Sequence, residues 1–136
     1  MVIYTFRTFP HIDELRGKFG DVFVFSELKR DLAVFETILE KNPDQVIGIA
    51  LIKGSSRQEP IAINRFNKGK ILAHGEDDLE LTILDNFPIA QTPTHSFCNW
   101  TMYRIQSFID ERGLSVKFSF IHINKNDLAL LDNLNR

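Results

Sequence analysis

Apolar and polar residues along the chain follow patterns typical of alternating strands and helices. Apolar runs of the kind found in buried strands lie at residues 2–6, 19–25 and 45–52. Between the last two runs, residues 28–41 carry apolar side chains at the spacing of an amphipathic helix, which Asn42-Pro43 ends. We expect a loop at residues 8–12, because Pro10 disfavours a helical conformation at Phe9.

The second half of the chain contains one further clear helix and one clear strand. A helix is predicted from Cys98 to Gly113, with Trp100 and Phe108 near one apolar face. Residues 116–123 alternate as a strand does, and a closing helix is expected at 127–134. A short extended piece is expected at 60–64. Residues 67–93 show no clear period, and the acidic residues within them are typical of a solvated face.

This order of elements predicts the fold class. Strand-helix-strand followed by helix-strand-helix is typical of a three-layer α/β/α arrangement around a mostly parallel sheet. A chain of 136 residues is long enough for one hydrophobic core and short for two. We therefore expect a single α/β domain over residues 1–136.

Composition and charge narrow the classes of partner. The chain is 43% hydrophobic and 25% charged, as ordinary globular proteins are. A net charge of −2 without a basic stripe gives no reason to expect nucleic acid or an anionic membrane. No apolar run has the length of a membrane span, and the first residues do not resemble a signal peptide. One cysteine cannot form an internal disulfide, which suits the cytoplasm.

The single cysteine is also the first candidate for chemistry. Cys98 begins the predicted helix, and His122 lies near the end of the strand that follows. If that strand belongs to a parallel sheet, both groups lie at the sheet edge where open α/β folds place their sites. A helix N-terminus lowers the pKa of a thiol, and an imidazole stabilises the thiolate. These residues therefore predict a nucleophile and its base.

Several short motifs resemble one family of cysteine peptidases. The Cys98-Asn99 pair and Phe120-Ile121-His122-Ile123, with a separation of 122 − 98 = 24, are similar to the nucleophile and histidine motifs of pyroglutamyl peptidase I, the pyrrolidone-carboxylate peptidase family. Glu59-Pro60-Ile61-Ala62-Ile63-Asn64 resembles the family's Glu-Arg-Val-Ala-Ile-Asn segment. Pro43-Asp44-Gln45-Val46-Ile47 resembles the strand entry that precedes it.

The resemblance implies a fold, an activity and roles for particular residues. The fold would be phosphorylase/hydrolase-like, and the activity would be removal of N-terminal pyroglutamyl residues without metal or organic cofactor. Cys98 would be the nucleophile and His122 the general base and acid, while Glu59 would orient His122. Oligomers are also implied, so a homo-oligomer is expected.

The substrate-binding segments depart from the family pattern. The family's glycine-rich segment is represented only by residues 5–10, so Phe6 and Phe9 are the candidates to pack on a pyroglutamyl ring, with Asn64 as a further binding residue. The family's oxyanion-stabilising arginine corresponds to a position near Lys68. A lysine ammonium is a flexible point charge and therefore replaces the planar guanidinium of arginine poorly. Asn99, in the first turn of the helix, is the other oxyanion candidate. Glu59 and Cys98 are only 98 − 59 = 39 residues apart, so the chain is a shortened and divergent relative.

Alternative interpretations apply to each of these residues. Cys98 can be a small buried hydrophobe, His122 a core histidine, and Glu59 an exposed loop residue. Phe6 and Phe9 can be core rather than pocket. His95, Cys98 and His122 can in principle ligate zinc, although the spacing matches no closed structural site. The chain can also be a catalytically inactive relative that acts as a binding module. The expected substrate is otherwise a peptide or small amide.

Overall fold

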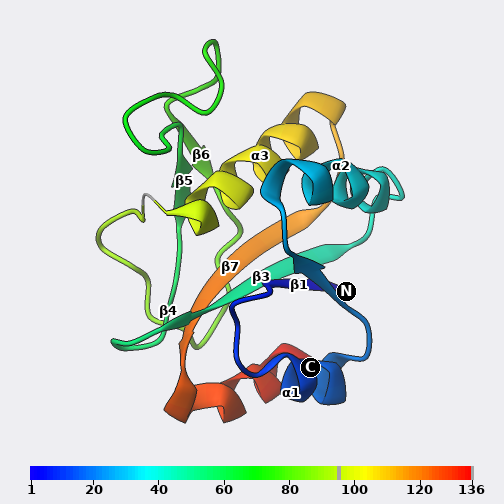
Figure 1. Cartoon of the computed structure of the whole chain (residues 1–136), viewed down its shortest axis with the longest axis vertical. Helices are drawn as coiled ribbons and strands as arrows, with labels where there is room; N and C mark the ends of the chain where they lie inside the picture. The colour runs from blue at the N-terminus through cyan, green and yellow to red at the C-terminus, as the bar shows by residue number, and fades with distance from the viewer. Residues whose placement is uncertain (95, 136) are drawn as a thin grey trace.

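The central element is a sheet of five strands in the order β2-β1-β3-β7-β4 (Figure 1). The structure, a computed structural model, describes residues 1–94 and 96–135. The first four strands of that order are mutually parallel, and β4 runs antiparallel to β7. The strands are β1 (Val2–Phe6), β2 (Val22–Phe25), β3 (Gln45–Ile52), β4 (Arg57–Gln58) and β7 (Lys117–Asn124). The prediction of a mostly parallel sheet is confirmed.

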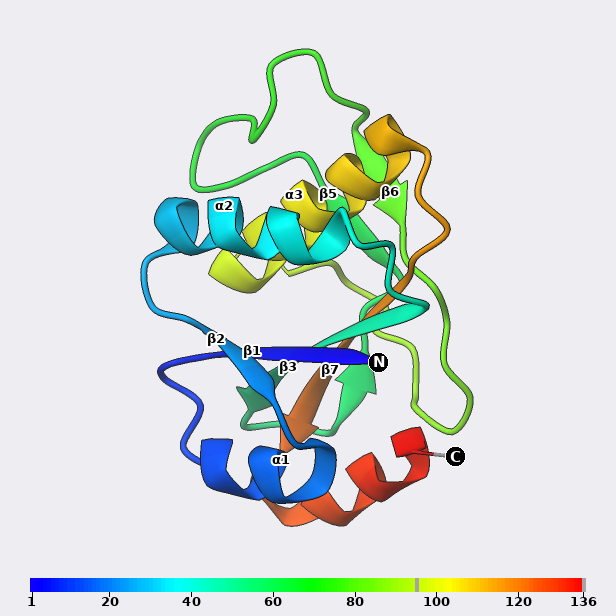
Figure 2. The same cartoon turned by 90° about the vertical axis from the view of Figure 1, so that its right-hand side faces the viewer.

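Helices cover both faces of this sheet, as Figure 2 shows. One face packs against α2 (Leu28–Leu39) and α3 (Phe97–Arg112), and the other packs against α1 (Ile12–Phe19) and the 3₁₀ helix η1 (Lys125–Asn135). A small antiparallel pair, β5 (Ile61–Ile63) and β6 (Asp78–Glu80), lies beside α3. The three-layer α/β/α prediction is therefore confirmed.

The N-terminal helix corrects the sequence prediction. Residues 8–12 were expected to form a loop and residues 19–25 a strand, but α1 spans Ile12–Phe19 and β2 begins only at Val22. Ile12, Leu15 and Phe19 are spaced as on one helical face, and all pack into the core beneath the sheet. Pro10 precedes the helix and therefore does not interrupt it. The closing helix also differs, since η1 consists of 3₁₀ turns that begin at Lys125 and are kinked at Asp127.

Each face of the sheet carries its own core. The core under α2 and α3 is rich in aromatic residues, and Tyr4 packs edge-on against Phe25 and Phe35 with ring centroids 5.2 and 5.3 Å apart. Gly48 of β3 has no side chain because Tyr4 and Phe120 occupy that space. The Tyr4 hydroxyl lies 3.2 Å from Thr101 Oγ1 of α3, which fixes this helix over the sheet.

Two local features set the ends of α3, whose start lies at the carboxyl edge of the sheet. Ser96 caps the helix, and its hydroxyl accepts a hydrogen bond from the Cys98 main-chain N–H at 3.2 Å. The other end stops at Gly113, whose φ of 62° is the left-handed conformation that glycine adopts freely. Cys98 therefore lies in the first turn, as predicted.

Candidate active site

A histidine and a carboxylate form a buried pair at the carboxyl edge of the sheet. His122 lies near the end of β7, where it pairs in register with Ala50 of β3. Its Nδ1 is 3.0 Å from Glu59 Oε2, and both side chains are buried. The main-chain N–H of Glu59 donates to the Phe120 carbonyl at 2.9 Å, which holds the carboxylate against β7. Glu59 is 1% exposed, so its interpretation as an exposed loop residue is wrong.

An arginine completes this pair, and the sequence analysis did not identify it. Arg57 Nε donates to the same Glu59 Oε2 at 3.1 Å, and Arg57 pairs in register with His122 across the β4–β7 ladder. The signal was the Arg-x-Glu spacing, because residues two apart along a strand project to one side. Glu59 Oε1 is buried and has no hydrogen-bond partner among the described residues. One oxygen therefore serves both the imidazole and the guanidinium.

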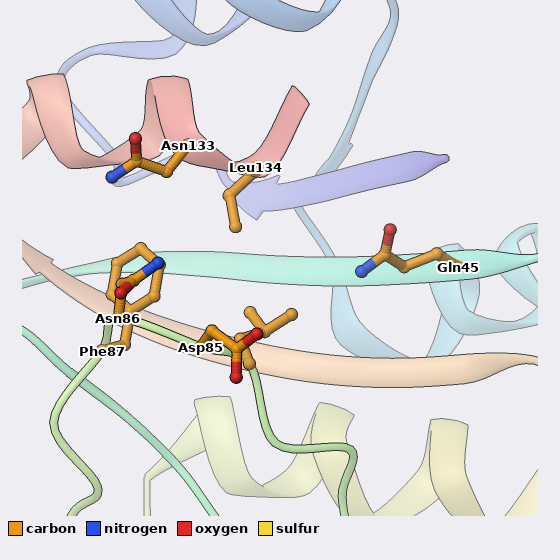
Figure 3. A pocket seen from close by; sticks show the side chains of 7 residues that line it. Gln45, Asp85, Asn86, Phe87, Asn133 and Leu134 are labelled. Carbon is orange, nitrogen blue, oxygen red and sulfur yellow. The ribbon is translucent and has the colours of Figure 1, made fainter. Parts of the chain in front are cut away.

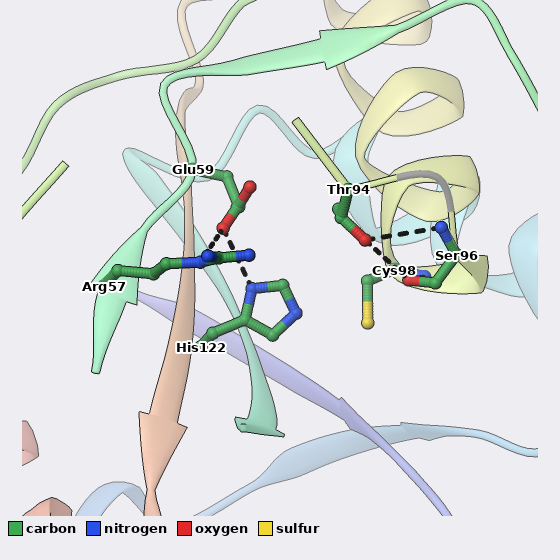
Figure 4. A network of polar contacts seen from close by, with 6 residues as sticks. All are labelled: Arg57, Glu59, Thr94, Ser96, Cys98 and His122. Carbon is green, nitrogen blue, oxygen red and sulfur yellow. Dashed lines mark hydrogen bonds and ion pairs between the residues drawn. The ribbon is translucent and has the colours of Figure 1, made fainter. Parts of the chain in front are cut away.

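The Cys98 thiol lies on the other side of the imidazole. Figure 4 shows the His122 ring with the Glu59 carboxylate on one side and the Cys98 side chain on the opposite side. Because Nδ1 is engaged by Glu59, Nε2 is the ring nitrogen available to the thiol. Within residues 1–94 and 96–135, no hydrogen bond joins the thiol to the ring. Catalytic hydrogen bonds of this kind often tighten only with substrate bound.

The electrostatics of Cys98 correct a second expectation. Burial raises the pKa of the thiol to about 12, the hydrogen bond with Ser96 opposes that rise, and the negative charge of Glu59 adds to it. The expectation of a lowered thiol pKa is therefore wrong for the free site. The side chain is 4% exposed, and loss of water around the thiolate outweighs the helix N-terminus. The thiol is protonated at neutral pH in this state.

A small aromatic pocket adjoins the thiol. It has a volume of about 80 Å³, more than the 10–15 Å³ that one water molecule requires. Phe6 and Phe9, the residues predicted to contact a substrate ring, both line it beside Cys98. Phe97 is a third aromatic wall, and its ring centroid is 4.8 Å from that of Phe6. Phe6 and Phe9 are also core residues, 4% exposed each, so the core and pocket interpretations both apply.

The side chains of three further candidate residues, Asn64, Asn99 and Lys68, are not directed to this site. The Asn64 amide accepts from the Ile71 and Leu72 main chain at 2.8 and 2.9 Å and donates to Leu72 O, so it organises the loop after β5. The Asn99 amide is fully buried and bonds the main chain of residues 63 and 65. Lys68 is exposed in the loop that projects beyond β5 and β6 (Figure 1). The family resemblance identified these positions in the sequence, but it could not predict the direction of their side chains.

Within residues 1–94 and 96–135, neither the pocket at the opposite edge of the sheet nor a metal-binding cluster provides a second set of reactive side chains. The pocket in Figure 3 has a volume of about 340 Å³ and lies at the opposite edge of the sheet, where β3 begins at Gln45. It is lined by Asp85, Asn86 and Asn133 but by no nucleophile. The described residues contain no cluster of three histidine, cysteine or acidic side chains that could hold a metal. His95, invoked for zinc, lies outside the described residues. No described helix is both long and apolar enough to cross a membrane.

The fold and the edge arrangement define a class: a three-layer α/β protein with a cysteine, a histidine and a glutamate gathered at the edge of the sheet where its parallel strands end. No protein-family model matches the chain, and no curated protein matches it by sequence.

Solved structures with the same fold are pyrrolidone carboxyl peptidases, also called pyroglutamyl peptidase I. The enzyme from Thermococcus litoralis superposes with a TM-score of 0.72 at 19% identity, covering 90% of this chain and 75% of that one. A mutant from Pyrococcus furiosus gives 0.71 at 19% identity, with 98% and 85% coverage. The Bacillus amyloliquefaciens enzyme gives 0.65 at 17% identity, with 90% and 80% coverage. The resemblance drawn from the motifs is confirmed for the fold.

Proposed function

We propose that the protein is a cysteine peptidase-like hydrolase that removes N-terminal pyroglutamyl residues from peptides or small amides. Cys98 is the nucleophile, His122 the general base and acid, and Glu59 the group that orients the imidazole. The observation that carries the proposal is the buried Glu59–His122 hydrogen bond of 3.0 Å beside a thiol that borders an aromatic pocket. The structures that share the fold have this activity in their names.

The raised thiol pKa determines how the reaction begins. Because Cys98 is protonated in the free site, its proton passes to His122 Nε2 as the sulfur bonds to the substrate carbonyl carbon. The Cys98 main-chain N–H donates to Ser96 Oγ at 3.2 Å, so among the first amides of α3 those of Phe97 and Asn99 are suited to the negative oxygen. The imidazolium then gives the proton to the leaving amine as the C–N bond breaks, which leaves a thioester on Cys98.

Hydrolysis of the thioester restores the site. His122 takes a proton from water as the water oxygen attacks the acyl carbon, and that proton returns to the departing Cys98 sulfur. Pyroglutamate is released, and no electrons enter or leave the cycle. The hydrogen bond from Nδ1 to Glu59 keeps one tautomer throughout, so that Nε2 can both accept and donate.

The aromatic pocket accounts for the choice of acyl group. Phe6, Phe9 and Phe97 present apolar rings, which suit a flat, uncharged lactam better than a free α-amino group. A charged N-terminal ammonium would lose its hydration there without gaining an anion. The pocket therefore favours pyroglutamyl over other N-terminal residues.

The test is hydrolysis of a fluorogenic pyroglutamyl amide by wild type, Cys98→Ala and Ser107→Ala. Ser107 lies on the same helix but outside the site, so its variant should match wild type. We expect turnover by wild type and Ser107→Ala, and none by Cys98→Ala. The corresponding alanyl amide should be a poor substrate. Turnover that survives Cys98→Ala would refute the assignment.

The second candidate function is a catalytically inactive binding module. The observation that favours it is the burial of Cys98, whose thiol contributes to the apolar core and has a raised pKa. This hypothesis predicts a folded protein without turnover on any pyroglutamyl substrate, and a Cys98→Ala variant with unchanged binding properties. The same hydrolysis assay separates the two functions.

A further inference from the structure

A second cavity lies at the carboxyl edge of the sheet and shares one lining residue with the aromatic pocket. Its volume is about 430 Å³, within the range of small-molecule sites. Leu51 lines both cavities, and Cys98 lines the aromatic pocket. The second cavity is lined by Leu51, Ile52, Lys53, Asn124, Lys125 and Asn126, at the ends of β3 and β7.

The positions of the acyl pocket and of His122 indicate that the leaving group lies toward this cavity. The acyl part lies in the aromatic pocket, and the leaving amine must depart beside His122, which protonates it. His122 and Asn124 are two residues apart on β7, so their side chains project from the same side at a separation of about 6.6 Å. A leaving residue that runs from His122 toward Asn124 covers about half of this separation, at about 3.3–3.6 Å per residue, so its carboxylate comes toward the second cavity.

A hydrogen-bond network fixes the wall of this cavity. The Asn124 amide donates to the carbonyls of Lys53 and Gly54 at 3.0 and 2.8 Å, which ties the turn after β3 to the end of β7. The Asn124 main-chain N–H donates to Ser56 Oγ at 2.8 Å, and Ser56 donates to Asp127 Oδ2 at 2.7 Å. Lys53 and Lys125 therefore lie on two segments that are joined by hydrogen bonds, and not on independent loops.

The charge of the cavity rim is positive. Lys53 and Lys125 are exposed, and neither forms an ion pair with a described residue. Asp127, two residues after Lys125, accepts from Ser56, and the charge of Arg57 is opposed by Glu59. Lys53 and Lys125, with Asp127 as the acidic residue near them, attract an anion. A dipeptide substrate supplies such an anion, because its leaving residue carries the C-terminal carboxylate.

We infer that this cavity binds the C-terminal carboxylate of a pyroglutamyl dipeptide, with Lys53 and Lys125 as its partners. The inference rests on the proposed function and adds a substrate class to it: short pyroglutamyl peptides with a free carboxylate next to the scissile bond. Leu51 and Ile52 provide apolar contact for the side chain of the leaving residue. The lysines act as specificity residues, and neither takes part in bond breaking.

The experiment compares four substrates: pyroglutamyl-alanine, its C-terminal amide, the amide of pyroglutamyl-aspartate, and the uncharged fluorogenic amide. The proteins are wild type, the double variant Lys53→Gln/Lys125→Gln, and the control Lys117→Gln at the opposite end of β7. We expect wild type to prefer the free acid over its amide by roughly three- to tenfold in kcat/KM, the size of one or two exposed charge pairs. Added salt should reduce the preference.

The variants decide the outcome. The double variant should lose the preference while it hydrolyses the fluorogenic amide at the wild-type rate, and Lys117→Gln should retain the preference. Equal rates for acid and amide in wild type, or a preference that survives in the double variant, would overturn the inference alone. A stronger preference for the aspartate amide would overturn the assignment to a terminal carboxylate. Hydrolysis of none of the substrates would overturn the proposed function and this inference together.

Discussion

Replacing Glu59 with glutamine tests whether the buried carboxylate acts on the imidazole. The variant keeps the shape of the side chain but removes the negative charge that accepts from His122 Nδ1 at 3.0 Å. A hydrogen bond to a charged group contributes about 1.5–3 kcal/mol. If that energy is expressed in the transition state, kcat/KM should fall roughly 10- to 150-fold at 1.36 kcal/mol for each factor of ten.

The effect of Glu59→Gln on stability should be small by comparison. The Arg57–Glu59 ion pair is lost, but Arg57 is 34% exposed and an uncharged glutamine no longer has a buried charge to desolvate. We therefore expect the melting temperature to shift by about 4 °C or less, since 1 kcal/mol corresponds to a shift of that order.

The assay pairs turnover of the fluorogenic amide with thermal unfolding, and its control is Glu40→Gln. Glu40 also forms an ion pair with an arginine, Arg112 at 3.5 Å, but both partners are more than half exposed. The control should change neither quantity measurably. A Glu59→Gln variant that is folded and keeps half or more of the wild-type kcat/KM would refute the reasoning.

Other expected outcomes concern the thiol, a helix start and a close contact. Iodoacetamide labelling of Cys98 should be slow at neutral pH and rise about tenfold per pH unit, because its pKa is about 12; a pH-independent rate would contradict this. Asp31 lies near the start of α2 and accepts from the Ser26 and Glu27 main-chain N–H groups, so the loss of its negative charge in Asp31→Asn should cost about 0.3–1 kcal/mol. Hydrogen bonds from Arg30 and from two main-chain amides lower the Asp31 pKa to about 2. The contribution of Asp31 to the free energy of unfolding is therefore present above about pH 3.9 and lost as pH falls through about 2. Urea unfolding of wild type and Asp31→Asn at both pH values measures this contribution. Gly48→Ala places a methyl group 2.6 Å from Tyr4 Oη and should cost about 1–3 kcal/mol, whereas Gly17→Ala, with open space around it, should not destabilise.

The parts of the fold with strong periodicity could be predicted from the sequence. The continuous apolar run at 45–52 and the alternation at 116–123 correspond to β3 and β7, which pair in parallel over their whole length. That pairing is what places His122 at the same edge as the start of α3. The short α1 was missed because its apolar face has few residues and Pro10 precedes it. The expectations of a single domain over 1–136, a cytoplasmic location and a homo-oligomer stay predictions.

The site was only partly accessible to sequence reasoning because its electrostatics depend on burial. Cys98 at a helix N-terminus suggested a low thiol pKa, yet the enclosing core raises it. Asn64 and Asn99 belong to matched motifs, but their amides stabilise main chain around β5 instead of facing the pocket. No periodic pattern marked the segment that contains Arg57. Its role follows only from the antiparallel pairing of β4 with β7.

Trapping of the acyl-enzyme tests the central claim most directly. Wild-type protein is mixed with the fluorogenic pyroglutamyl amide, quenched in acid during turnover, and measured by intact mass spectrometry followed by peptide mapping. We predict a mass increase of one pyroglutamyl group, located on the peptide that contains Cys98 and absent from Cys98→Ala. A pyroglutamyl adduct on another residue, or turnover by Cys98→Ala at the wild-type rate, would contradict the account.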